Sequence, residues 1–293
     1  MELFHTVDEL RAWSRACRRV HREAQAAVLA PAGLAPIGLV PTMGALHRGH
    51  ASLIRAARAA CHHVAVSIFV NPTQFGPNED YSRYPRTFDA DCELAASEGA
   101  DVVFAPPVEE LYPAGASTFV EVEGLSGRLD GKSRLGHFRG VATVVAKLFI
   151  AAEPDQAFFG QKDAAQVAVL RRMTADLRMG TKIVVCPIIR DADGLALSSR
   201  NIYLSPAERM QALTLSRAIH LVADLAVIGE RRSPALIEAA RKTFAAAPEI
   251  RVDYIALVDW ATLEPIETAT PGSLFAVAAY VGATRLIDNT ILD

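Results

Sequence analysis

Residues 37–54 read IGLVPTMGALHRGHASLI. The apolar run 37–40 is short and is followed by proline, which is typical of a strand buried on both faces of a sheet. The turn after it contains Gly44 and Gly49 and leads into a predicted helix at 50–61. A buried strand that passes through a glycine-containing turn into a helix is the repeating unit of a parallel α/β sheet.

Short apolar runs and helix-length segments alternate in the same way as far as residue 189. The runs that predict buried strands are 37–40, 64–70, 102–105, 157–159 and 183–189. The segments that predict helices are 50–61, 87–98, 141–152 and 164–179. Because crossovers between parallel strands are right-handed, the pattern predicts a doubly wound α/β domain with helices on both faces of the sheet.

The pattern changes after residue 189. A polar loop at 190–199 is followed by predicted helices at about 205–228 and 233–247 and by predicted strands at 252–258 and 274–280. These elements indicate a smaller α+β domain. We therefore expect two domains, at residues 1–188 and 189–293.

The composition is that of a folded protein with little net charge. The chain has 293 residues, of which 51% are hydrophobic and 22% are charged, and its net charge is −3. These values exclude disorder and argue against a broad electrostatic surface for nucleic acid or anionic membranes. The wide spacing of the cysteines predicts free and mostly buried thiols instead of a disulfide framework or a zinc site. The cysteines are Cys17, Cys61, Cys92 and Cys186.

Two stretches bear on where the protein works. Residues 1–13, MELFHTVDELRAW, lack the basic stretch and apolar core of a secretory signal. The weakly polar stretch 26–40 is broken by prolines and glycines, and it falls short of the roughly 20 apolar residues that a membrane-spanning helix needs. We expect a cytoplasmic protein with no membrane segment and no nucleic-acid partner.

The turn 41–50, PTMGALHRGH, is a candidate phosphate site. Main-chain N–H groups and the helix dipole favour phosphate where a strand leads into a helix. His47 and His50 are three residues apart, so they share a face of the first helical turn and can donate to phosphate oxygens. A single histidine there is typical of a cap or a surface residue, but ligands bind outside the carboxyl ends of parallel strands, which favours a function.

Polar side chains follow two further predicted strands. The amides of Asn71 and Gln74 donate and accept hydrogen bonds, which suits a hydroxy acid, although an ordinary Asn-Pro turn favours the same residues. Lys162 supplies a compact cation for a triphosphate. Asp163 fits a ribose hydroxyl or a helix cap, and Gln166 fits either the site or a solvated helix face.

The loop before the second domain holds a fourth cluster, Ser198, Ser199 and Arg200. Two hydroxyls followed by arginine can close over a nucleotide as a mobile clamp, since the guanidinium is always charged and can form two bonds to phosphate. Residues 126–133, SGRLDGKS, approach the G-x-x-x-x-G-K-S phosphate loop, but Ser126 replaces its first glycine and no clear buried strand precedes it. We interpret 126–133 as a flexible polar loop.

Six strings of the sequence together resemble the pantoate-β-alanine ligase family. They are PTMGALHRGH (41–50), SIFVNPTQFGPNEDYSRYPRT (67–87), GHFRGV (136–141), FFGQKD (158–163), DGLALSSRN (193–201) and RLIDN (285–289). They occur in the family's order and span nearly the whole chain, so together they are far more specific than any one of them.

The resemblance implies a member of the H-x-G-H nucleotidyl-transfer superfamily, with a Rossmann-like first domain, a smaller C-terminal domain that acts as a lid, and a homodimer. The implied reaction converts (R)-pantoate and ATP to an enzyme-bound pantoyl adenylate and pyrophosphate, after which the amine of β-alanine displaces AMP. Mg²⁺ would be held mainly by the triphosphate and water. Asp89 and Asp91 form a pair of acids typical of a solvated helix face, so no protein ligand to the metal is assigned.

The resemblance also assigns residues by position. The family's ATP-binding segments match Met43, Gly44, Ala45, Leu46, His47, Arg48, Gly49, His50, Gly160, Gln161, Lys162, Asp163, Ile189, Leu197, Ser198, Ser199 and Arg200. The implied catalytic group is His47, His50, Lys162 and Arg200, with His50 at the family's proposed proton donor. Gln74 and Gln166 match the pantoate-binding amides, and Gln74 is also placed near β-alanine. Three further matches to the pocket are Asn71, Tyr84 and Arg134.

One position departs from the family, which usually has glutamate where this chain has Gln161. Glutamine removes a negative charge but keeps the size and a hydrogen-bond acceptor. If the family's contact there is made by the main chain, activity survives, and this is the outcome that we expect. If the carboxylate matters, ATP binding or the dependence on Mg²⁺ would differ.

Two other functions remain open from the sequence. Another H-x-G-H adenylyltransferase would act on a cofactor precursor and retain AMP in its product, but the amides of Gln74 and Gln166 favour a small hydroxy acid. A catalytically silent nucleotide-binding protein would be expected to have lost part of the set His50, Lys162 and Arg200, and all three are present.

Overall fold

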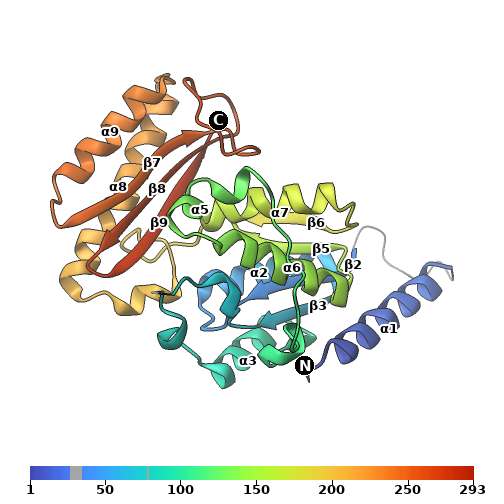
Figure 1. Cartoon of the computed structure of the whole chain (residues 1–293). Helices are drawn as coiled ribbons and strands as arrows, with labels where there is room; N and C mark the ends of the chain where they lie inside the picture. The colour runs from blue at the N-terminus through green and yellow to red at the C-terminus, as the bar shows by residue number, and fades with distance from the viewer. Residues whose placement is uncertain (27–34, 78) are drawn as a thin grey trace.

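The structure is a computed structural model that describes residues 1–26, 35–77 and 79–293. It contains a six-stranded parallel sheet and a three-stranded antiparallel sheet, each packed against its own helices (Figure 1). The parallel strands are β1 (Glu2–Phe4), β2 (Ala35–Thr42), β3 (Cys61–Ile68), β4 (Val102–Phe104), β5 (Gln156–Gly160) and β6 (Lys182–Cys186). Their order is β1-β4-β3-β2-β5-β6, which confirms the predicted Rossmann-like, doubly wound fold.

Helices cover both faces of the parallel sheet. The parallel sheet and its helices form the first unit of the structure. These helices are α1 (Val7–Ala26), α2 (Arg48–Ala60), α3 (Phe88–Ser97), α4 (Val108–Leu111), α5 (Asp130–Ser133), α6 (His137–Ala152) and α7 (Ala164–Asp176). Val40 of β2 belongs to the apolar cluster under α2 and α3, whereas its neighbour Leu39 belongs to the cluster under α1, α6 and α7. Successive residues of a strand point to opposite faces, so burial on both faces explains the continuous apolar run.

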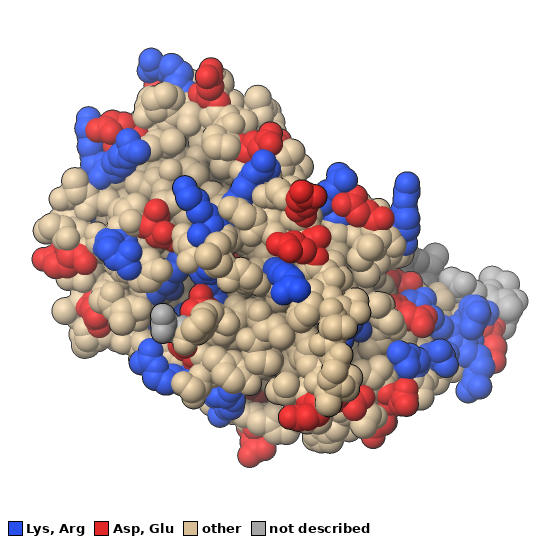
Figure 2. Space-filling view, viewed as in Figure 1, with Lys and Arg blue, Asp and Glu red and all other residues tan. Residues whose placement is uncertain are grey.

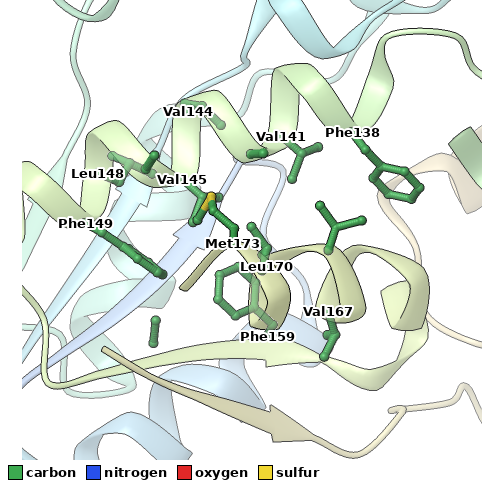
Figure 3. Close-up of a cluster of buried hydrophobic side chains, with 14 of the residues drawn as sticks. Phe138, Val141, Val144, Val145, Leu148, Phe149, Phe159, Val167, Leu170 and Met173 are labelled. Atoms are coloured by element: carbon green, nitrogen blue, oxygen red, sulfur yellow. The ribbon is translucent and has the colours of Figure 1, made fainter. Parts of the chain in front are cut away.

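The larger core lies around α6 and α7. Figure 3 shows side chains of both helices gathered with Phe159 of β5, among them Phe138 and Val145 from α6 and Leu170 and Met173 from α7. α6 is buried around almost its whole circumference. This burial explains why its sequence is apolar on all sides, since such a helix is stable only in a core.

The direction in which strands are added to the sheet reverses between β2 and β5. From β2 the chain builds β3 and β4 on one side, and it then returns to build β5 and β6 on the other. The carboxyl ends of β2 and β5 therefore border a crevice, which is where open α/β sheets bind ligands. The turn after Thr42 and the turn after Gly160 both open at this point.

The antiparallel sheet belongs to the second unit. It consists of β7 (Ile250–Val258), β8 (Ser273–Val281) and β9 (Thr284–Leu292), and its helices are α8 (Pro206–Val227) and α9 (Ser233–Ala245). Phe275 and Val277 of β8 pack with α8 and α9. Leu274 and Ala276 join the core cluster of the first unit instead. The two units therefore share buried apolar contacts through the second face of this sheet.

Two predicted segments differ from the structure. The predicted strand 183–189 is too long, because β6 ends at Cys186 and Pro187 has no N–H with which to continue the ladder. Residues 126–133 are not a flexible loop, since they include most of a 3-10 turn and all of α5. Asp130 in α5 is buried and is ion-paired with Arg285 of β9 at 2.7 Å.

The sequence-based prediction lacked the strands β1 and β9, the helix α1 and the short helices α4 and α5. β1 has only three residues, which is too short for a pattern. β9 is hidden because it places the polar side chains of Asp288 and Asn289 at buried positions, which breaks the apolar alternation expected of a strand.

The surface charges and the cysteines agree with the expectations from the sequence. Figure 2 shows side chains of both signs interspersed on the visible face of the molecule. The four cysteines are free thiols, and three of them are buried, as predicted. Within the described residues, no helix is long and apolar enough to cross a membrane.

Candidate active site

An open cleft of about 1360 Å³ lies where the carboxyl ends of β2 and β5 meet the loop that precedes α8. The predicted site residues that line it are Met43, His47, Gly49, His50, Asn71, Gln74, Tyr84, Arg134, Gly160, Lys162, Asp163, Gln166, Ile189, Leu197, Ser198, Ser199 and Arg200. The predicted residues outside its lining are Gly44, Ala45, Leu46, Arg48 and Gln161. The fold thus brings the four sequence clusters together around one cleft.

The two histidines lie side by side at the start of α2, with ring centroids 4.1 Å apart. His47 is the N-cap of the helix, and its Nδ1 accepts a hydrogen bond from the Gly49 N–H at 3.1 Å. The Nδ1 of His50 accepts from the His47 N–H at 3.2 Å. A neutral imidazole that accepts at Nδ1 carries its proton on Nε2, so each ring has an Nε2–H to offer a ligand.

Both rings are neutral at physiological pH. Burial lowers the pKa of His47 to about 4, and the charge of Lys162 acts in the same direction. Burial also lowers the pKa of His50 well below its usual 6.5, with smaller contributions from His47 and Lys162. The histidines therefore act as neutral donors, and Lys162 and Arg200 supply positive charge to the cleft.

Gly49 is required by the His47 ring. A Cβ on residue 49 would lie 2.8 Å from Cε1 and 2.9 Å from Nδ1 of that ring. Any larger side chain would push the ring out of its position over the helix start. The glycine between the two histidines thus permits the packing that fixes the His47 tautomer.

A carboxylate from α3 holds the turn between β2 and α2. The N–H groups of Ala45 and Leu46 donate to Asp91 at 2.8 and 2.7 Å, and the Thr87 hydroxyl donates to it at 3.0 Å. Asp91 is 2% exposed, so the prediction that it lies on a solvated helix face is wrong, whereas Asp89 is exposed as predicted. The amides of Ala45 and Leu46 are thus occupied by a side chain of the protein.

Gln74 is held at both its side chain and its main chain. Its Oε1 accepts from Asn71 Nδ2 at 3.1 Å, and its Nε2 donates to Met43 Sδ at 2.8 Å. Its main-chain carbonyl accepts from His137 Nδ1 at 2.9 Å. Gln166 lines the same cleft from α7. The two predicted pantoate amides therefore lie on different elements of one cleft.

His137, at the start of α6, is a site residue that the sequence reasoning missed. Its Nε2 accepts from Arg134 Nη1 at 3.0 Å, and Arg134 is paired with Glu79 at 2.6 Å. Burial lowers the pKa of His137 to about 3, and the charge of Arg134 acts in the same direction. Arginine can only donate, so the proton of this neutral ring is on Nδ1, where it holds the Gln74 carbonyl.

The start of α6 also approaches the Gln74 turn very closely at Gly140. A Cβ on residue 140 would lie 2.3 Å from the Thr73 carbonyl oxygen and 2.6 Å from the Gln74 nitrogen. Asn71 is 1% exposed, and its Nδ2 also donates to the Gly140 carbonyl at 3.1 Å. Asn71 therefore joins Gln74 to α6, which explains its place in the pocket.

The turn after β5 carries Lys162 and Asp163, whose Nζ and carboxylate are 3.5 Å apart. Asn289 of β9 holds the main chain of this turn, because its Nδ2 donates to the carbonyls of Gln161 and Lys162 at 3.0 and 2.9 Å. The Gln161 amide donates to Asn289 Oδ1 at 3.3 Å, so this side chain bonds to β9. Asn289 lies within the string RLIDN, which was the only sequence signal for it.

Arg200 is held at the cleft by Asp80, which the sequence reasoning also missed. Its Nε and Nη2 donate to the two oxygens of Asp80, each at 2.8 Å, and its guanidinium lies 5.6 Å from the centre of the Tyr84 ring. Burial disfavours the charged form of Asp80, but the bonds from Arg200 outweigh burial and lower the pKa of Asp80. Ser199 Oγ donates to the Ala45 carbonyl at 3.1 Å, so this cluster is docked on the first unit.

The donor set of the cleft suits an anionic nucleotide and a small hydroxy acid. Two neutral Nε2–H donors and two cations can stabilise negative charge on phosphate oxygens. Two amides can bond both hydroxyl and carboxylate groups. Within the described residues, no group of three or more His, Cys, Asp or Glu side chains is arranged to hold a metal ion.

Known proteins resemble this chain in sequence and in fold over nearly their whole length. A family model for pantoate-β-alanine ligase matches residues 2–291. A pantothenate synthetase of Acidobacterium capsulatum is 58% identical over 292 residues, which cover 100% of this chain and 97% of that protein. A crystal structure of pantothenate synthetase from Thermus thermophilus has a TM-score of 0.89 and 44% identity, and the match covers 100% of this chain and 99% of that one.

A third relative was crystallised with ligands. The pantoate-β-alanine ligase of Francisella tularensis, in complex with β,γ-ATP and β-alanine, has a TM-score of 0.76 and 33% identity, with 99% of this chain and 97% of that one covered. These matches span both units at identities well above those that show a shared fold alone. The chain therefore belongs to the pantoate-β-alanine ligase family.

Proposed function

We propose that this chain ligates (R)-pantoate to β-alanine at the expense of ATP, forming pantothenate, AMP and pyrophosphate through a pantoyl adenylate. Membership of the family and the relative at 58% identity support the overall reaction. One observation carries the mechanism: two half-buried, neutral imidazoles, His47 and His50, line one cleft with Lys162.

In the first half-reaction, a carboxylate oxygen of pantoate attacks the α-phosphorus of ATP. The bond from this phosphorus to the β-bridging oxygen breaks as the new P–O bond forms, which gives the adenylate and pyrophosphate. Negative charge grows on the departing oxygens, where the Nε2–H groups of His47 and His50 and the ammonium of Lys162 stabilise it. Because the pKa of His50 is far below 6.5, this residue acts as a hydrogen-bond donor from the neutral ring.

Positioning makes the second contribution to the rate. The amides of Gln74 and Gln166 hold pantoate so that its carboxylate faces the α-phosphorus, and Asp163 and the backbone of Gly160 hold the ribose side of ATP. Arg200 supplies the second cation for the phosphates. No side chain of the protein needs to act as a nucleophile, because the substrate carboxylate does so.

In the second half-reaction, the neutral amine of β-alanine attacks the acyl carbon of the adenylate near Gln74. The C–O bond to AMP breaks, AMP leaves with the electron pair, and the nitrogen loses its proton as the amide forms. Activation is needed because a carboxylate has no usable leaving group, whereas an acyl phosphate has one.

Mg²⁺ would be held mainly by the triphosphate of ATP and by water. The described residues offer no cage of three or more acidic or histidine ligands, and Mg²⁺ prefers phosphate oxygens and water when few carboxylates are present. When bound, the ion neutralises charge on the pyrophosphate. Lys162 and Arg200 line the same cleft, and we propose that they take up the charge that remains on the phosphates.

We further propose that residues 1–188 bind ATP and pantoate and that residues 189–293 supply the lid over them, with only part of this unit moving. Leu274 and Ala276 are buried in the core of the first unit, so movement of the whole second unit would expose them. Closure therefore needs to involve mainly the segment 194–203, which carries Ser199 and Arg200.

We propose that the protein forms a homodimer and that it works in the cytoplasm. The family resemblance supports the dimer, and size-exclusion chromatography with light scattering tests it, since the chain mass is 31.5 kDa. Four free thiols fit a reducing compartment, which supports the cytoplasm.

Exchange of labelled pyrophosphate into ATP tests the mechanism. With Mg²⁺ and without β-alanine, exchange should require (R)-pantoate, and AMP should be released when β-alanine is added. Exchange that needs a different acid would move the assignment to another adenylyltransferase. A folded protein that binds ATP but gives no exchange would be a silent nucleotide binder.

A further inference from the structure

The turn that precedes the two histidines has an unusual main-chain shape. Gly44 and Ala45 are successive residues with positive φ, at +81° and +50°. Residues other than glycine adopt this region rarely, and they do so where the surroundings hold them there. Ala45 therefore needs support from neighbouring groups.

Asp91 supplies that support from α3. Its two oxygens accept from the consecutive amides of Ala45 and Leu46, at 2.8 and 2.7 Å, and Thr87 adds a third hydrogen bond. Two consecutive amides that point the same way form a small anion-binding nest, and here the anion is a buried carboxylate of the protein itself. The shape of the turn thus depends on the position of one carboxyl side chain.

The peptide group between Ala45 and Leu46 also contacts the segment that precedes α8. The Ala45 carbonyl accepts from Ser199 Oγ at 3.1 Å, next to Arg200. One residue after Leu46, the His47 N–H donates to the ring of His50. A shift of the Ala45 peptide would therefore move both histidines and loosen the seat of the Ser199 segment.

We propose that Asp91 is a positioning residue for adenylation, which holds the turn 43–47 so that His47 and His50 keep their place and their Nε2–H tautomers. The inference rests on the proposed roles of these two histidines. Asp91 acts through the main chain of the turn and makes no contact with substrate in this scheme.

The test compares Asp91→Asn with Asp89→Asn. Both variants remove one negative charge from the first turn of α3, but Asp89 is exposed. The asparagine at 91 keeps the shape and turns an NH₂ group toward an amide that needs an acceptor. We expect kcat for pyrophosphate exchange to fall by about 30- to 100-fold in Asp91→Asn, the scale of a small misplacement of catalytic groups. The KM for pantoate should change much less than kcat, because Gln166 lies on another element and Gln74 keeps its bonds to Asn71 and His137 when its contact with Met43 is disturbed. Asp89→Asn should match the wild type.

Imidazole nitrogen NMR supplies a readout that reduced stability alone would not change. The wild type and Asp89→Asn should both give Nε2–H signals for His47 and His50, and Asp91→Asn should shift or broaden them. Wild-type kcat with wild-type imidazole signals in a folded Asp91→Asn would overturn the proposal. If that variant does not fold, Thr87→Val decides, because it removes one bond of three: a several-fold lower kcat supports the proposal and an unchanged kcat overturns it. Absence of exchange in the wild type would instead overturn the histidine roles, and the NMR comparison would still test the support of the turn.

Discussion

Acid should destabilise this protein through His137. In an unfolded chain a histidine binds its proton near pH 6.5, whereas in the folded protein burial lowers the pKa of His137 to about 3. Between these two values the unfolded state binds a proton that the folded state excludes. Stability is therefore fully present above pH 6.5 and is lost as the pH falls toward 3.

The two pKa values set the size of the effect. Linkage gives a loss of about 2 kcal/mol at pH 5 relative to pH 8, and of about 4 kcal/mol by pH 3. The side chain is only 9% exposed, so solvent screening reduces this effect little. A loss of about 2 kcal/mol is a substantial part of the stability of an ordinary domain.

His137→Gln isolates this contribution. Glutamine can donate to the Gln74 carbonyl and accept from Arg134, as the neutral ring does, but it does not titrate. Urea unfolding at a fixed protein concentration should show that the wild type loses about 2 kcal/mol more than the variant between pH 8 and pH 5. Comparison of the two proteins at each pH cancels the other titrating groups. Equal losses in both proteins would refute the claim that the fold holds His137 neutral.

Four substitutions test other parts of the site. His50→Ala and Lys162→Ala should each lower adenylate formation by about two to three powers of ten without unfolding the protein, as loss of one transition-state donor does, and near-normal exchange in either folded variant would remove its proposed role. Gln161→Glu should leave kcat and the KM for ATP within about twofold in steady-state assays, because this side chain faces Asn289 and lies outside the lining of the cleft; a large change in Mg²⁺ dependence would contradict this. Gly140→Ala should raise the KM for pantoate at least about tenfold and destabilise the fold by about 1–3 kcal/mol in urea, because its Cβ would displace the Gln74 turn, and an unchanged KM would count against that contact.

The sequence predicted the fold best where burial is simplest. β2 and β5 lie in the sheet with both faces covered, so their apolar runs were visible in the sequence within about two residues of their ends. β9 was invisible because Asp288 is buried as the partner of Arg190, at 2.6 Å, a contact that only the folded chain creates. Long-range pairing of this kind leaves no local period in the sequence.

Some residues of the candidate site could be predicted from the sequence and others could not. Residues that follow strand ends, such as His47 and Lys162, were predictable because parallel strands bring their carboxyl ends to one edge. The residues that hold those turns were not. Asp91 lies 46 positions from Ala45, His137 lies 63 from Gln74, and Asn289 lies 128 from Gln161. No helix or strand spacing connects such pairs, so only the tertiary structure identifies them.

These three supporting side chains all bond to the main chain of a turn that borders the cleft. Asp91 accepts from main-chain amides, and His137 and Asn289 donate to main-chain carbonyls. Each therefore fixes the course of a turn while leaving the side chains on that turn free to meet a substrate. Electrostatic stabilisation of a transition state is effective when donors are already aimed before the charge develops. Burial of neutral histidines alone would not aim them. The main-chain bond to each Nδ1, on a turn that Asp91 holds, leaves the Nε2–H groups free, and in the proposed mechanism these groups donate to the departing pyrophosphate.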